Sequence, residues 1–322
     1  MRATALALLI CSGIGHAQSY APAEGLPGST AISRQSPSFT AWASGIEVTR
    51  GYVNASDPDQ SASGSNLVTA GQPEHAIGFP DGNTVSLGDG GFAVCTFESP
   101  IADGSGYDFA VFENGSTAYL ELAFVEASSD GVHFFRFPNH SETQTATQLG
   151  TFGTPVAGFL NNLAGKYGAL YGTPFDLSEL PDDDLLDKHS VTHIKVIDVI
   201  GSVDPQFGQA DSFGNLVNDS FPTPFNSGGF DLQAVGVIHS QLGLNEPDLD
   251  SARLYPNPTT GMSTVEIHGA FELEVADASG KVIARKKSEN FDQIDASAFA
   301  DGMYLVRIRQ ENAEKIIKLI KM

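Results

Sequence analysis

Short runs in which apolar and polar residues alternate recur along the whole chain, and a period of two residues is typical of half-buried β-strands. Between these runs lie clusters of Gly, Pro, Asn, Asp and Ser, which favour turns and loops. The pattern therefore predicts an all-β protein whose main domain, residues 41–240, is a β-sandwich. A short helical stretch is expected at 177–186. The clearest predicted strands span residues 84–87, 92–97, 109–112, 120–128, 133–137, 192–199 and 234–239.

A second group of alternating runs follows a break at Pro256 and Pro258, two residues that cannot donate a backbone hydrogen bond to a strand. The runs cover residues 265–267, 271–275 and 304–308, with a turn expected at 278–281. Residues 252–322 are therefore predicted to form a small, immunoglobulin-like β-sandwich. Residues 241–251 are predicted to be a linker.

The beginning of the chain has the pattern of a secretory signal peptide, residues 1–17. Arg2 precedes an apolar run that is too short to span a bilayer, and small residues then lead to Ala17. We expect residues 18–40, rich in Pro, Gly and Ser, to be a flexible lead-in, and no later run is long enough for a transmembrane segment. Removal of the signal would leave one cysteine, Cys95, which we expect to be buried inside a strand.

Charge is distributed unevenly along the chain. Residues 18–249 contain 6 Lys or Arg against 28 Asp or Glu, a net charge of −22, whereas residues 250–322 contain 10 against 11. Such an acidic domain repels nucleic acid and anionic lipid. It attracts hard divalent cations, because Ca²⁺ prefers carboxylate, amide and carbonyl oxygens. Solubility of a secreted protein is the alternative explanation of the same charge.

The end of the chain resembles the C-terminal sorting domain of type IX secretion cargo in Bacteroidota. The residues that carry the resemblance are YPNPTTG at 255–261, GMYLVRI at 302–308 and KLIK at 318–321. The resemblance implies that the type IX secretion machinery is a partner. It also implies export across the outer membrane, followed by release or attachment at the cell surface.

Several blocks of the main domain resemble a family of secreted bacterial surface proteins. They are HAIGFPDG at 75–82, VSLG at 85–88, DFAVFENG at 108–115, ASSDG at 127–131, GTPFDL at 172–177, FPTPF at 221–225 and GGFDL at 228–232. The first two blocks are also similar to galactose-binding-like jelly rolls, in which a loop of this type often helps to hold a structural calcium ion. This second resemblance implies a jelly-roll-like sandwich with a binding role.

Two groups of oxygen-bearing side chains are candidate sites for calcium or for a polyhydroxy ligand. Asp81, Asn83 and Asp89 lie in turns at the two ends of one predicted strand. The second group comes from strand ends and from the loop at 200–230, where an acid is costly to bury unless it is paired or bound to a metal. Pairing of Asp198 and Asp231 with Lys195, Arg136 or backbone amides is the alternative. The second group comprises Glu113, Asn114, Asp198, Asp204, Asp211, Asn215, Asn218, Asp219 and Asp231.

The sequence lacks the GxSxG, HExxH, Walker A and dinucleotide-binding motifs, which argues against the usual hydrolase and nucleotide chemistry. Tyr167 and Tyr171 lie in a Gly-rich segment from which they could stack on sugar rings. We therefore expect a non-catalytic, calcium-dependent module that binds a glycan or a small molecule at the cell surface. A structural or adhesive surface protein and a polysaccharide-degrading enzyme are the alternatives.

Overall fold

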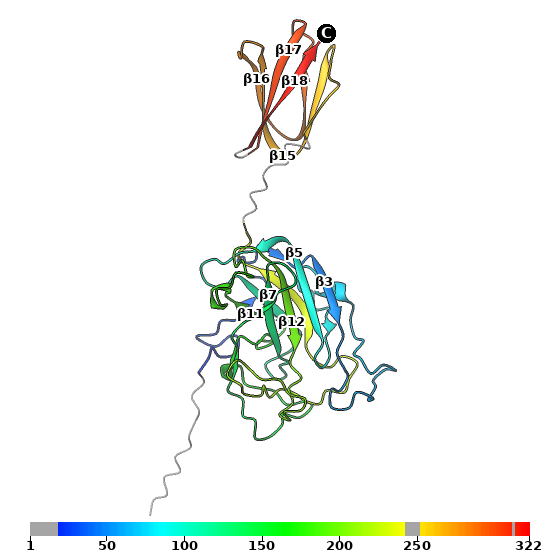
Figure 1. The fold of residues 1–322 in the computed structure, drawn as a ribbon, viewed down its shortest axis with the longest axis vertical. Coiled ribbons are helices and arrows are strands. Elements are labelled where there is room, and N and C mark those ends of the chain that lie inside the picture. Colours follow the sequence, from blue (N-terminus) through cyan, green and yellow to red (C-terminus); the bar gives the residue numbers. More distant parts are fainter. Residues whose placement is uncertain (1–18, 242–251, 311–312) are drawn as a thin grey trace, which may run out of the picture. The chain divides into compact units, whose positions relative to one another are not determined.

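The structure, a computed structural model, describes residues 19–241, 252–310 and 313–322 of the chain (Figure 1). The chain divides into two compact units, residues 1–241 and 242–322. Both consist of antiparallel strands, which confirms the all-β prediction. The predicted signal peptide and all of the predicted linker except Gln241 lie outside the described residues. No helix in the described ranges is long and apolar enough to cross a membrane.

Two sheets form the main unit. The first has the order β1-β11-β6-β13-β2, and β4 also pairs with β13. Its strands are β1 (Ile32–Ser33), β2 (Ala41–Trp42), β4 (Val85–Ser86), β6 (Phe109–Glu113), β11 (Tyr171–Phe175) and β13 (Asp231–Val237). The second sheet has the order β3-β5-β12-β7-β8. Its strands are β3 (Gly45–Thr49), β5 (Phe92–Ile101), β7 (Ala123–Ser128), β8 (Phe135–Arg136) and β12 (Val191–Asp198).

The facing sides of the two sheets form one hydrophobic core. Val111 and Val235 belong to the first sheet, and Val125 and Ile194 to the second; all four are buried in the same cluster. Burial of aliphatic side chains of this size stabilises the fold by about 1.5–3 kcal/mol each. The alternating pattern of the sequence thus marks the residues that lie between the two layers of the sandwich.

The smaller elements connect the strands of the main unit. A two-stranded sheet pairs β9 (His140–Ser141) with β10 (Leu160–Asn161). Short 3₁₀ helices cover Pro73–Ala76 (η1), Ala157–Phe159 (η2) and Leu177–Glu179 (η3). The predicted helical stretch at 177–186 is thus reduced to three residues, because Pro181 ends it by lacking a backbone donor.

Residues 19–40 differ from the flexible lead-in that their composition predicted. Ile32 and Ser33 pair with β11, and the Thr30 hydroxyl lies 2.8 Å from the Tyr167 hydroxyl. The Arg34 guanidinium donates to the carbonyl of Pro80 at 2.6 Å. These contacts join the segment to residues far away in sequence, so composition alone could not have predicted them.

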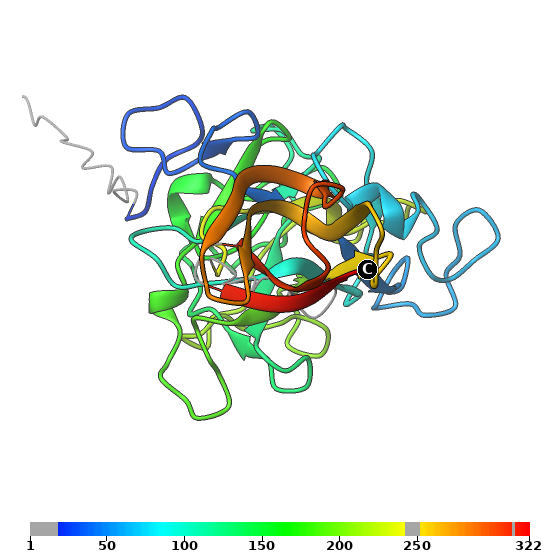
Figure 2. The same ribbon diagram turned by 90° about the horizontal axis from the view of Figure 1, so that it is seen from above.

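The C-terminal unit is a separate antiparallel β-structure. It comprises β14 (Arg253–Tyr255), β15 (Met262–Asp277), β16 (Val282–Asp295), β17 (Gly302–Gln310) and β18 (Ala313–Lys321), in the order β14-β15-β17-β18 with β16 also paired to β15. Figure 2 shows these strands end-on, around a common interior. Val265, Leu273, Val306 and Leu319 are buried there, as the alternation in the sequence predicts.

Cys95 lies within β5, is fully buried and has no disulfide partner. Burial raises the pKa of its thiol to about 12, and the thiolate is the reactive form. We expect native protein to react with a thiol reagent such as Ellman's reagent at least 100-fold more slowly than protein unfolded in guanidinium chloride. Equal labelling rates in the two conditions would contradict the buried position of Cys95.

Candidate functional site

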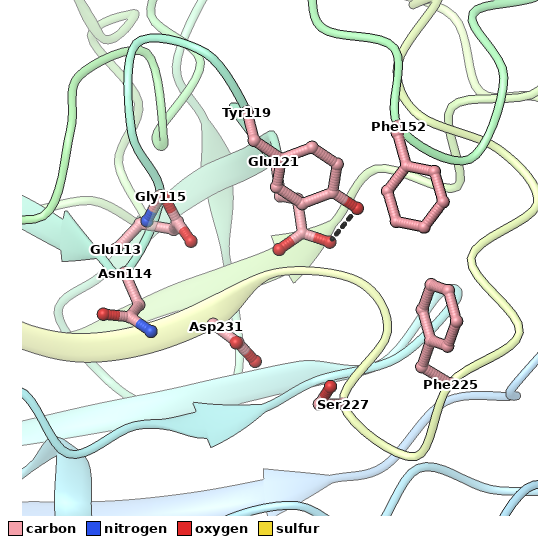
Figure 3. Close-up of a pocket in the computed structure, with 9 residues that line it drawn as sticks. All are labelled: Glu113, Asn114, Gly115, Tyr119, Glu121, Phe152, Phe225, Ser227 and Asp231. Atoms are coloured by element: carbon pink, nitrogen blue, oxygen red, sulfur yellow. Dashed lines mark hydrogen bonds between the residues drawn. The ribbon is translucent and has the colours of Figure 1, made fainter.

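A pocket with a cavity volume of about 310 Å³ lies in the main unit and combines acidic with aromatic side chains (Figure 3). The carboxyl groups of Glu113, Glu121 and Asp231 lie on one side of the view, and the rings of Phe152 and Phe225 lie on the other. The remaining lining residues are Asn114, Gly115, Tyr119 and Ser227.

Glu113 is the last residue of β6 and is almost fully buried. Its Oε2 accepts a hydrogen bond from the backbone N–H of Gly115 at 2.5 Å. A Cβ atom at position 115 would lie 2.4 Å from this oxygen, so a glycine is needed for the carboxylate to fold back on the loop. The loop then closes through two backbone hydrogen bonds between Ser116 and Tyr119, which direct Tyr119 towards the pocket.

Asp231 begins β13, beside β6, because Leu232 pairs with Glu113 across the two strands. Its Oδ1 accepts from the Ser86 hydroxyl of β4, at 2.5 Å. The charge of Arg50 acts on Asp231, but the Arg50 guanidinium itself donates to main-chain carbonyls, at 2.7 Å for both Ala70 and Gly71. The first sheet therefore supplies two acids from adjacent strand ends.

Glu121 lies in the segment that leads into the second sheet, two residues before β7 begins. It lies between two buried leucines, Leu120 and Leu122, and is itself only 8% exposed. Asp219 holds this segment in place: its Oδ2 accepts from the Leu122 N–H at 2.7 Å and its Oδ1 from the Ser220 N–H at 2.8 Å. The pocket thus forms where the ends of both sheets meet.

Asp198 performs a similar role at the end of β12. Its Oδ1 accepts from the Phe230 N–H at 2.7 Å and its Oδ2 from the Gly90 N–H at 3.0 Å. Asp89 in turn accepts from the Ala55 N–H at 2.7 Å. Asp198 therefore accepts hydrogen bonds from backbone amides, which was the alternative to a metal that the sequence left open. Its bond from the Phe230 N–H fixes the residue that precedes Asp231.

Burial raises the pKa of every acid in this region. The pKa of Glu113 and of Glu121 lies well above the usual range because of burial, and the neighbouring negative charges raise each further. Burial raises the pKa of Asp231 to about 6, against the opposing effects of the Ser86 hydrogen bond and the Arg50 charge. Burial also raises the pKa of Asp89 and of Asp219 to about 7.

The structure brings three of the five predicted ligand-binding residues together, since Glu113, Asn114 and Asp231 all line the pocket. It places the two tyrosines elsewhere. Tyr167 is 1% exposed and is covered by the segment that carries Thr30, so its ring is not available for stacking on a sugar. Tyr171 is half-buried in β11 and does not line the pocket.

The six predicted metal ligands do not gather into one site. Asp81 is exposed and accepts hydrogen bonds from the N–H and the side-chain amide of Asn83, both at 2.9 Å. Asp211 accepts from the N–H groups of Ser141 and Phe213, and Asp89, Asp198 and Asp219 bind the amides described above. These oxygens accept hydrogen bonds within the protein, and among the described residues none of the five acids belongs to a group of three or more acidic, His or Cys side chains close enough to share an ion.

A different acidic group lies where the sequence suggested none. Among the described residues, Asp103, Asp108 and Asp176 form the one group of at least three potential ligand residues with ligand atoms within 4.8 Å of one another. Asp108 Oδ1 lies 2.8 Å from His239 Nδ1 and accepts from Gly104, while its Oδ2 accepts from Leu177. Hydrogen bonds within the protein thus already engage both oxygens of its most buried member.

Sequence reasoning missed Glu121 and Phe152. Glu121 had a recognisable signal, an acid between two leucines in a predicted strand. Phe152 had none, because a Gly-rich loop carries it and the pairing of distant strands determines where that loop lies. Phe152 is 77% exposed, and its ring centroid lies 6.0 Å from that of Phe225.

We expect the melting temperature of the protein to fall as the pH rises from 5 to 8. A carboxyl whose pKa is raised by folding adds stability below its unfolded pKa of about 4, and this stability is lost as the pH rises through its folded pKa, about 6 for Asp231 and about 7 for Asp219. For a domain of this size, each kcal/mol corresponds to roughly 2–4 °C. Calorimetry across this range measures the change.

The overall negative charge of the domain acts in the same direction, so a variant is needed as the control. Asp219→Asn keeps a side-chain oxygen that accepts a hydrogen bond and removes the titrating group. We expect the fall in melting temperature between pH 5 and 8 to be smaller in this variant. An unchanged fall would mean that Asp219 is ionised across the whole range.

Comparison with known proteins characterises the C-terminal unit. Residues 253–322 match the family described as Secretion system C-terminal sorting domain. No curated protein matches the chain. Among solved structures, a β-glucuronidase from Ruminococcus gnavus in complex with D-glucuronic acid is similar at 10% identity and a TM-score of 0.23, over 90% of this chain and 48% of that chain.

A biofilm associated protein, BSP domain, is similar at 10% identity and a TM-score of 0.22, over 89% of this chain and 52% of that chain. The chain spans about half the length of these structures, and TM-scores this low carry no argument about the main unit. The sorting domain does identify the export route. The protein is type IX secretion cargo that is delivered to the cell surface or released outside the cell.

Proposed function

We propose that the main domain is a non-catalytic binding module and that it binds a glycan in the pocket between Glu113 and Phe225. The observation that carries the proposal is the combination of buried carboxyl groups and exposed aromatic rings around one hollow. Type IX export supports it, because a module carried to the outside of the cell can meet polymeric carbohydrate. Binding rests on the pocket and not on the similarity to galactose-binding-like jelly rolls.

The chemistry of the lining suits a polyhydroxy ligand. Carboxyl oxygens accept hydrogen bonds from sugar hydroxyls, and the amide of Asn114 adds both donors and acceptors. Phe152 and Phe225 present apolar faces on which the C–H face of a sugar ring can pack, and both are solvent-exposed without a ligand. A pocket of about 310 Å³ is at the small end of ligand sites and suits one or two sugar residues.

A larger hollow of about 680 Å³ is a weaker candidate. Its lining includes a single acid, Glu142, together with Leu149, Val156 and Phe159. It also reaches Ser19, the first described residue. We therefore place the ligand in the smaller, acidic pocket.

The carboxyl groups favour binding over glycoside hydrolysis. A hydrolase that uses two carboxyl groups needs one protonated and one ionised, and it keeps their pKa values apart through different surroundings. Burial raises the pKa of both Glu113 and Glu121, with Asp231 raising that of Glu113 further and Glu113 raising that of Glu121 further, so these two carboxyl groups do not form such a pair. Turnover of a polysaccharide that is lost in Glu121→Gln would reverse this assignment and make the domain an enzyme.

Calcium dependence stays a prediction of the acidic composition. It is measured by comparing the melting temperature of the protein in excess calcium with that in a chelator, because a ligand that binds the native state alone raises stability. If the two temperatures agree, the domain does not depend on calcium. An adhesive or structural role is the remaining alternative, favoured if no glycan binds.

We expect Phe225→Ala to weaken binding of any glycan identified on an array by about tenfold, because packing of an aromatic face contributes ~1 kcal/mol or more. Isothermal titration calorimetry measures the affinity. Phe213→Ala is the matched control, since Phe213 is 71% exposed and lies outside the pocket. Equal losses in the two variants would remove the pocket from the proposal, and no loss in Phe225→Ala would do the same.

A further inference from the structure

The pocket is lined by several acidic side chains and by no basic side chain that could neutralise them. Glu113, Glu121 and Asp231 line it, and none of its nine lining residues is Lys, Arg or His. The charge of Arg50 acts on Asp231, but the Arg50 guanidinium donates to main-chain carbonyls and does not line the pocket. A ligand that enters the pocket therefore meets carboxyl groups and no cationic side chain among the lining residues.

Glu121 in particular lacks the partners that the other buried acids have. Within the described residues, its one hydrogen-bond contact is with the Tyr119 hydroxyl, at 3.4 Å, which exceeds the usual length of an O–H···O bond. The same hydroxyl can donate to the Thr151 carbonyl at 3.2 Å, and it has only one hydrogen to give.

The contrast with Asp219 is sharp, because Asp219 is similarly buried and accepts two backbone hydrogen bonds of 2.7 and 2.8 Å. Glu121 is therefore a carboxyl group that is 8% exposed, under-satisfied and directed into the pocket (Figure 3). Such a group is destabilising without a ligand, because a buried polar group loses its hydrogen bonds to water and gains too few in the protein.

The aromatic rings opposite the acids suit an organic cation. The ring centroids of Phe152 and Phe225 lie 6.0 Å apart, and that of Tyr119 lies 6.5 Å from that of Phe152. The faces of aromatic rings attract ammonium groups through the negative charge of their π-electrons, and the attraction is stronger when water is excluded. Carboxyl groups on one side and aromatic faces on the other are both features that recognise an amine.

A metal ion fits this pocket less well. Calcium binds its oxygen ligands at 2.3–2.6 Å, so three carboxyl groups that share one ion bring oxygens to within about 5 Å of one another. In the described part of the chain, Asp103, Asp108 and Asp176 meet that condition, and the pocket acids do not. An ammonium group has three donors on a flexible organic body and tolerates a wider spacing.

We propose that this pocket recognises a protonated primary amine, with Glu121 as its main partner. The inference rests on the proposed function and specifies its ligand class, a glycan that carries unacetylated amino sugars. A linear polyamine has the same charged group without the sugar ring, so the experiment must separate the two sources.

The test is isothermal titration calorimetry of the secreted protein at pH 7 with three probes: chitotriose with free amines, its fully N-acetylated form and spermidine. We expect chitotriose to bind at least tenfold more tightly than the acetylated form. We also expect Glu121→Gln to weaken chitotriose binding at least tenfold. Asp103→Asn is the matched control, because it removes an acid outside the pocket, and we expect it to leave the affinity unchanged.

A second readout does not depend on how well Glu121→Gln folds. Binding of the ammonium group should ionise carboxyl groups that are protonated in the free protein, so the measured heat should vary with the ionisation enthalpy of the buffer. The exposed Phe152→Ala, which should not disturb folding, should weaken chitotriose binding several-fold. Absence of both effects would overturn the inference.

The outcomes separate the amine inference from the proposed function. Equal binding of the free and acetylated trimers would overturn the amine inference and leave glycan binding intact. Binding of spermidine alone would support the amine site and remove the glycan. A response to calcium that Glu121→Gln abolishes would assign the pocket to a metal instead. No binding of any probe would overturn the amine inference, and the glycan array would then decide the proposed function.

Discussion

Carboxyl groups buried against backbone amides determine how the loops of the main domain meet. Asp198 joins the turn at Gly90 to the segment at Phe230, and Asp219 joins the loop after β12 to the start of β7. A hydrogen bond of this kind contributes about 0.5–1.5 kcal/mol, and leaving a buried backbone amide unsatisfied costs about 1–3 kcal/mol. The position of Asp231 and Glu121 follows from these two anchors.

The anchors work because glycine allows the backbone to approach the acids closely. A Cβ atom at Gly229 would lie 2.6 Å from Asp198 Oδ1, and Gly229 has a φ of 70°, which favours glycine. A Cβ atom at Gly201 would lie 2.8 Å from the Cβ of Asp219. Acids and glycines therefore act together in this domain. The described residues contain one cysteine, which is buried and free, so side-chain burial and hydrogen bonds stabilise the described structure instead of disulfides.

The sequence predicted those features that depend on local pattern. Alternation identified the strands, and the apolar surroundings of Asp198 showed that its burial needs a partner. The sequence could not predict which groups these partners are. Phe230 and Gly90 come from distant parts of the chain, and they contact Asp198 only after β12 and β13 have taken their places in different sheets. For the same reason the sequence predicted an exposed Tyr167. The Tyr167 hydroxyl contacts the hydroxyl of Thr30, which lies 137 residues away in the chain. The sorting domain needed no such knowledge, since its landmarks are contiguous.

The burial of Glu121 is the physical reason to prefer the proposed binding role to that of a surface scaffold. In a scaffold, an apolar residue between Leu120 and Leu122 would continue the buried surface and would avoid the desolvation of a carboxyl group. Asp219 and Asp198 offset that desolvation through backbone amides, whereas Glu121 has one long contact with a hydroxyl that has another acceptor. A ligand that supplies the missing donors would recover this free energy on binding. The poor satisfaction of Glu121 in the free protein and the affinity of the pocket would then have the same physical origin.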